Sequence, residues 1–162
     1  MPLVVFGYGN VSRGDDAFGP LLLERIEAAA PPGVTLVEDY QLQIDHALDL
    51  NGADLALFID AGTGTPPPFR FYETAPQVST ALTSHALAPE AVLDIFRKVT
   101  GAAPPPAFVL CVRGEDFALG HGLSPEGAHN LEAAWQFLLG LIIRPEVELW
   151  RGLAARPLSE NG

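Results

Sequence analysis

The sequence predicts an α/β fold, a three-layer α/β/α sandwich with a mostly parallel central sheet. Short apolar runs rich in β-forming residues alternate along the chain with segments whose apolar residues recur every three to four positions, which is typical of βαβ units. The 162 residues, 48% of them hydrophobic, suffice for one core, and no long linker divides them. We therefore expect residues 1–162 to form a single domain.

Glycine and proline punctuate the chain between the predicted elements. Phe18, Leu22 and Ile26 form the apolar stripe of a first helix, which Pro31-Pro32-Gly33 stops. Five consecutive apolar residues, 55–59, stand between two aspartates and predict a central buried strand. In order, we expect strand 3–6, a helix from about 18, strand 34–37, a short helix within 42–50, strand 55–59, an edge strand 69–73, helix 89–99, strand 107–112 and a long helix ending near 143. The tail from Arg144 carries Trp150 but no motif.

Composition excludes several classes of protein. Nine basic against 20 acidic residues give a formal charge of −11, which disfavours nucleic acid or an anionic membrane as a partner and favours a basic or metal-bearing one. A lone cysteine, Cys111, excludes an intramolecular disulfide and a cysteine-cluster zinc site, and its apolar neighbours predict a buried core thiol. The chain shows no secretory leader and no apolar run of 18 residues, so we expect a cytoplasmic protein.

The loop after the first strand holds three glycines and two adjacent acids, Asp15 and Asp16. Ser12 stands where the third glycine of a G-x-G-x-x-G dinucleotide motif belongs, and two carboxylates would repel a pyrophosphate but attract a cation. A nucleotide-binding module is therefore the weakest of the functional hypotheses. The structural alternative is that both acids cap the following helix and complement its positive end.

Two further residues lie where a cation site would need them. Asp60 closes the central strand, and His85 precedes the next helix. Right-handed crossovers would bring the loops after the first, third and penultimate strands to one edge, so that Asp16, Asp60 and His85 converge. Two carboxylates and one imidazole suit zinc or nickel and leave positions open for water or substrate. The alternatives are that Asp60 only binds its own loop and that His85 is solvated.

Other polar residues have simpler interpretations. Ser124 followed by Pro125 predicts the N-cap of the long helix. Asp39 is either a further site residue or an exposed strand end. His46 and His129 fall in predicted helices, as surface or core residues, and His121 is the best spare ligand candidate.

Four segments together resemble the hydrogenase maturation protease family. They are Gly7-Tyr8-Gly9-Asn10 with Gly14-Asp15-Asp16-Ala17-Phe18-Gly19, then Ile59-Asp60-Ala61, Ser84-His85 and Gly122-Leu123-Ser124-Pro125. These endopeptidases trim the C-terminal extension of the large subunit of nickel-iron hydrogenase. The resemblance implies that Asp16, Asp60 and His85 are both the metal ligands and the catalytic residues.

The resemblance also implies a substrate and a metal. The expected substrate is a hydrogenase large-subunit precursor that carries the nickel which the site recognises, with zinc as the other candidate ion. We expect no nucleotide, nucleic acid or membrane partner. The alternative function is a non-catalytic, nickel-sensing chaperone that holds the precursor without cutting it.

Overall fold

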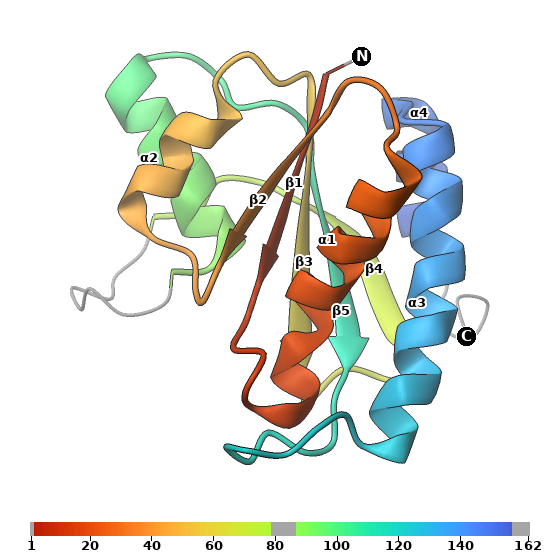
Figure 1. Ribbon diagram of the computed structural model, residues 1–162. Helices are drawn as coiled ribbons and strands as arrows, with labels where there is room; N and C mark the ends of the chain where they lie inside the picture. The colour runs from red at the N-terminus through yellow and green to blue at the C-terminus, as the bar shows by residue number, and fades with distance from the viewer. Residues whose placement is uncertain (1, 79–86, 157–162) are drawn as a thin grey trace.

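A five-stranded sheet forms the centre of the computed structural model, which describes residues 2–78 and 87–156. The strands are β1 (Leu3–Tyr8), β2 (Val34–Asp39), β3 (Leu55–Gly62), β4 (Phe69–Thr74) and β5 (Ala107–Arg113), in the spatial order β2-β1-β3-β5-β4. Four strands are parallel, and β4 pairs antiparallel with β5 at one edge (Figure 1). The predicted α/β sandwich with a mostly parallel sheet is confirmed.

Helices cover both faces of the sheet, as Figure 1 shows. The helical elements are η1 (Gly14–Ala17), α1 (Phe18–Ala29), η2 (Ile44–Leu50), α2 (Pro89–Thr100), α3 (Pro125–Ile143) and α4 (Val147–Ala154), of which η1 and η2 are 3₁₀ helices. Side chains of β1 alternate between the two cores: Leu3 and Val5 pack with α1 and α3, whereas Val4 and Phe6 pack with η2 and α2. Burial on both faces explains why the strand reads as a continuous apolar run.

The C-terminal helix α4 is an element that the sequence did not reveal. Its Trp150 is fully buried, and the indole Nε1 donates to the carbonyl oxygens of Leu141 at 3.2 Å and Arg144 at 3.1 Å. The ring packs edge-on against Phe71 and Phe108. The tail after α3 therefore closes one core instead of trailing from it.

The direction of β4 corrects one step of the sequence-based reasoning. Thr74, at its end, pairs with Ala107 at the start of β5, so the chain leaves β4 at the amino ends of the parallel strands. The crossover rule had implied that the loop after β4 starts at the edge where β1 and β3 end. That prediction is wrong, because the loop starts at the opposite edge. None of the described helices is long and apolar enough to cross a membrane.

Candidate active site

Asp60 lies at the carboxyl end of the central strand, next to the loop that carries Asp16. Its Oδ1 accepts a hydrogen bond from the backbone N–H of Ala61 at 2.8 Å, and Oδ2 accepts none from the described residues. Burial, and next to it the negative charge of Asp16, raises the pKa of Asp60 to about 6. The two predicted carboxylates are therefore close enough to interact electrostatically.

Tyr8, the last residue of β1, lies beside Asp60. Its hydroxyl is buried and has no hydrogen-bond partner among the described residues. Burial, followed by the charge of Asp60, raises the pKa of Tyr8 well above its usual value of 10, so the phenol stays protonated. A neutral donor thus stands beside the buried carboxylate.

Asp16 is held by the glycine-rich loop. Its Oδ2 accepts the backbone N–H of Asn10 at 2.6 Å, and Oδ1 accepts no bond from the described residues. Gly9 has φ of 148°, and a Cβ there would collide with the carbonyl oxygen of Asp16. Glycine at position 9 is therefore needed for the loop to fold closely around Asp16.

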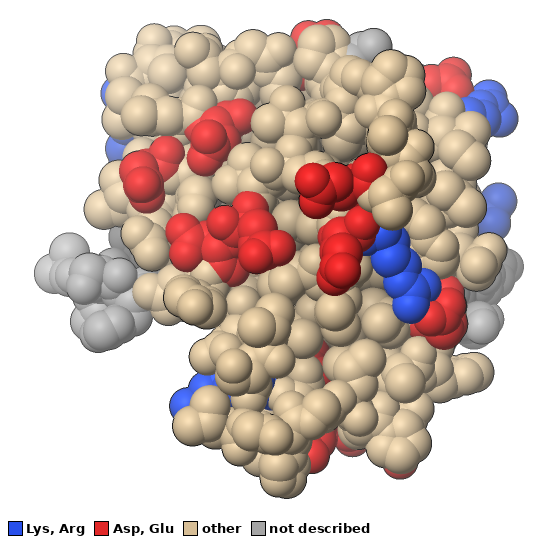
Figure 2. Space-filling model, viewed as in Figure 1, with Lys and Arg blue, Asp and Glu red and all other residues tan. Residues whose placement is uncertain are grey.

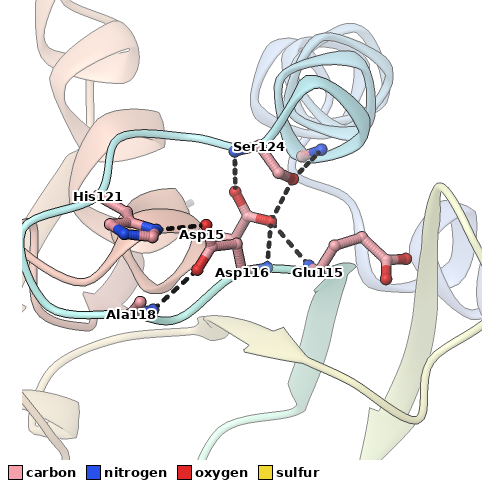
Figure 3. A network of polar contacts seen from close by, with 7 residues as sticks. Asp15, Glu115, Asp116, Ala118, His121 and Ser124 are labelled. Atoms are coloured by element: carbon pink, nitrogen blue, oxygen red, sulfur yellow. Dashed lines mark hydrogen bonds and ion pairs between the residues drawn. The ribbon is translucent and has the colours of Figure 1, made fainter.

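Figure 3 shows Asp15 surrounded by residues of the loop that follows β5 and of the start of α3. Its side chain is fully buried, and it accepts backbone hydrogen bonds from Glu115 (2.7 Å), Asp116 (3.2 Å) and Ser124 (2.8 Å). Burial alone would raise the pKa of Asp15, but these bonds outweigh it and hold the pKa below its ordinary value of 3.8. Asp15 joins the loops after β1 and β5 to the start of α3.

Neither acid caps α1, so the capping part of the structural alternative for this pair is wrong. The helix follows η1 directly, and no side chain accepts a hydrogen bond at its N-cap. The predicted N-cap of α3, in contrast, is confirmed: Ser124 Oγ accepts from Gly127 N–H at 2.9 Å, and it also donates to Asp15 Oδ2 at 2.6 Å. A Cβ at position 127 would overlap the Asp15 carboxylate, so Gly127 provides the space for Asp15.

Several solved structures with a similar arrangement of elements are hydrogenase maturation proteases or endopeptidases. The HybD endopeptidase from E. coli aligns with a TM-score of 0.73 and 22% identity over 90% of this chain and 94% of its own. The HycI protease from Thermococcus kodakarensis KOD1 aligns with a TM-score of 0.67 and 22% identity over 88% and 93%. A hydrogenase 2 maturation peptidase from a Thaumarchaeota archaeon gives a TM-score of 0.62 at 20% identity over 88% and 98%. The chain has the fold of the hydrogenase maturation proteases. No family model matches the sequence, and no curated protein matches it.

The third predicted ligand cannot be placed in this maturation-protease fold. His85 and the preceding Ser84 lie outside the described residues. Within residues 2–78 and 87–156, no three His, Cys, Asp or Glu side chains are grouped so that they could hold a metal ion. Asp16 and Asp60 are thus brought together, and the assignment of His85 stays a prediction.

The histidines that the structure describes have other contacts. His121 is exposed and pairs through Nδ1 with Asp116 Oδ2 at 2.7 Å, in the loop before α3. His46 is buried in η2, where Nδ1 accepts the N–H of Gln43 and Nε2 lies 3.2 Å from Asp39 Oδ2. An acceptor at Nδ1 makes Nε2 the donor, so His46 holds Asp39 at the end of β2. His129 is exposed on α3.

Cys111 is less buried than its apolar neighbours suggested. It is half-buried on β5, in register with Asp60, and its Sγ lies 3.0 Å from the hydroxyl of Thr65. Burial, and after it the charge of Asp60, raises the pKa of the thiol, which keeps it protonated and unsuited to nucleophilic attack. The thiol thus packs against the core, as predicted, and lies beside Asp60.

Proposed function

We propose that the protein is a metal-dependent endopeptidase that removes the C-terminal extension of a nickel-loaded nickel-iron hydrogenase large-subunit precursor. One observation carries the proposal: Asp16 and Asp60 each have one oxygen held by a backbone N–H and one oxygen without a partner among the described residues. Fixed carboxylates with a spare oxygen are suited to hold a divalent ion. The names of the structural neighbours support the choice of reaction.

The donor set fits a nickel or zinc ion. A cation between Asp16 and Asp60 would offset the burial and repulsion that raise the pKa of Asp60, and His85 would add the nitrogen ligand that these ions favour. A bound divalent ion supplies polarisation of a carbonyl group and activation of water. The chain's own part is to orient two carboxylate oxygens, and Tyr8 adds a neutral donor beside them. The nickel itself arrives with the precursor.

The cellular setting and the partners complete the proposal. We place the reaction in the cytoplasm, where a single free cysteine is expected. The charge of −11 argues against nucleic acid and anionic membranes as partners. The precursor is the proposed partner, and no nucleotide enters the reaction.

Incubation of the purified protein with a nickel-loaded large-subunit precursor tests the proposal. We expect the precursor to shorten by its C-terminal extension, as measured by intact-protein mass spectrometry. Asp16→Asn, Asp60→Asn and His85→Ala should abolish the shortening. Asp54→Asn is the matched control because Asp54 immediately precedes β3, at the amino end of the strand that carries Asp60 near its carboxyl end. Co-elution of uncut precursor with the wild-type protein would instead establish the chaperone alternative.

A further inference from the structure

Strand β2 has one open edge. Among the described residues it pairs with β1 alone, at the end of the sheet. Gly33 and Asp39 direct their carbonyl oxygens to β1, where Leu3 N–H and Gly9 N–H donate to them at 2.9 and 3.1 Å. Because backbone groups alternate sides along a strand, the N–H and C=O groups of Leu36 and Glu38 point away from β1. A further strand could pair there.

A groove follows this edge between β2 and α1. Three hollows of about 450, 270 and 170 Å³ lie end to end, since the first shares Val11 and Glu38 with the second and shares Glu27 and Leu36 with the third. We call this continuous depression the β2 groove. At one end it reaches Gly9 and Asp39, next to the loop that holds Asp16. The groove therefore leads to the candidate active site.

The walls of the β2 groove are acidic above an apolar floor. Glu24 and Glu27, one turn apart on α1, face Glu38 of β2, and all three are exposed with no ion pair among the described residues. Arg25, the basic residue between them, is paired with Glu132 of α3. Figure 2 shows Asp and Glu side chains gathered over α1 and β2 on this face of the molecule. The groove thus favours a basic occupant over an acidic one.

We infer that the β2 groove binds an extended, basic segment of the polypeptide that the active site processes. The segment pairs with β2 as an added strand, and every second side chain, Lys or Arg, points to the carboxylates of α1 and β2. That the segment belongs to the substrate rests on the proposed function. A second copy of this chain, at a charge of −11, would be repelled, and so would a nucleic acid.

The strand pairing is tested with a synthetic eight-residue peptide of alternating lysine and valine. In amide hydrogen exchange with the peptide bound, we expect slowed exchange at Leu36 and Glu38, whose N–H groups point outward, and no change at Val37, which already faces β1. Glu38→Pro removes one outward N–H and should weaken binding at least tenfold relative to Glu38→Gln. Equal binding by these two variants, or protection elsewhere, would overturn the pairing.

The charge requirement is tested with two double variants of the same net charge. Glu24→Lys with Glu27→Lys should weaken binding of the lysine–valine peptide about tenfold or more at physiological salt. Asp54→Lys with Glu148→Lys changes two exposed acids that do not line the groove, and should change binding less than threefold. A glutamate–valine peptide should not bind. An equal loss of binding in both double variants would overturn the inference, because it would show that the net charge of the protein, and not the groove, controls binding of the peptide.

The precursor distinguishes this inference from the proposed function. If the wild-type protein cuts the precursor and the Glu24→Lys, Glu27→Lys variant cuts it with an unchanged KM, the groove is not the substrate's site although the enzyme assignment stands. A raised KM with kcat retained supports the groove. If the peptide protects Leu36 and Glu38 but no precursor is cut, the groove stands as a binding site and the proposed function fails.

Discussion

Asp15 and Asp16 are adjacent in the chain, yet their surroundings assign them opposite tasks. Asp15 is buried and saturated by four donors from two distant segments, whereas Asp16 accepts a single hydrogen bond and keeps one oxygen without a described partner. A saturated buried carboxylate stabilises the fold, and a half-satisfied one is available to a ligand. The pair thus consists of one structural and one candidate functional residue.

Asp15→Asn should lower the free energy of unfolding by about 2–4 kcal/mol at pH 7, because an amide nitrogen cannot accept from the buried N–H groups that Asp15 serves. Urea unfolding measures it. Because the pKa of Asp15 is lowered in the folded protein, its ionised carboxylate stabilises the fold above about pH 4, and this stabilisation is lost as the pH falls further. The difference in unfolding free energy between wild type and Asp15→Asn should therefore shrink in acid. Asp16→Asn, the control, should cost less than about 1 kcal/mol. Equal costs would contradict the division of tasks.

Asp60→Asn should make the metal-free protein more stable at pH 8. The pKa of about 6 in the folded protein exceeds the ordinary value of 3.8, so ionisation of Asp60 costs stability as the pH rises from about 4 to 7. The variant removes this cost, worth about 1–3 kcal/mol at pH 8 and vanishing near pH 4. Unfolding in urea with a chelator present, at both pH values, measures the difference. A variant less stable than wild type at pH 8 would show that a positive group compensates Asp60.

Among the helices and strands, the existence of α4 and the direction of β4 are the features that the residue pattern did not predict. Helix α4 is only eight residues long, and a segment this short has little helical stability of its own. It is held by Trp150, which fills the space between α3 and the phenylalanines of β4 and β5. Strand β4 was expected at an edge, where it lies, but its direction depends on pairing with β5.

Trp150→Ala should therefore destabilise the protein by about 3–5 kcal/mol, through loss of a fully buried ring and of its bonds to the end of α3. Trp135→Ala is the matched control, because Trp135 is only half-buried on α3, where its ring centroid lies 5.9 Å from Arg25 Cζ. This variant should lose less than half as much unfolding free energy as Trp150→Ala. Thermal unfolding followed by circular dichroism compares them. Equal shifts in Tm would mean that α4 contributes little to the core.

At the scale of the whole molecule, the excess of carboxylates works against the folded state. The chain contains nine basic and 20 acidic residues, and its isoelectric point is about 4.5. Repulsion among like charges destabilises a compact chain, and salt screens it over about 10 Å at 0.1 M. The same excess makes binding of polyanions electrostatically unfavourable.

Raising sodium chloride from 20 to 300 mM should therefore raise the stability, by about 1 kcal/mol, as measured by the urea midpoint at pH 7.5. The double variant Asp54→Lys, Glu148→Lys carries less negative charge and should show a smaller increase. A fall in stability with salt would instead show that ion pairs such as Arg151 with Glu73 dominate the surface electrostatics.

Local periodicity and residues close together in the chain were enough to predict the class of fold, most elements, the N-cap at Ser124 and the position of Asp60 near a strand end. Which acid of the first loop is buried could not be predicted in this way, because Asp15 meets Glu115 and Ser124, a hundred residues away. The core position of Trp150 and the antiparallel direction of β4 likewise depend on contacts between distant segments. Such contacts follow from which surfaces meet when the layers pack, and local residue patterns do not encode that.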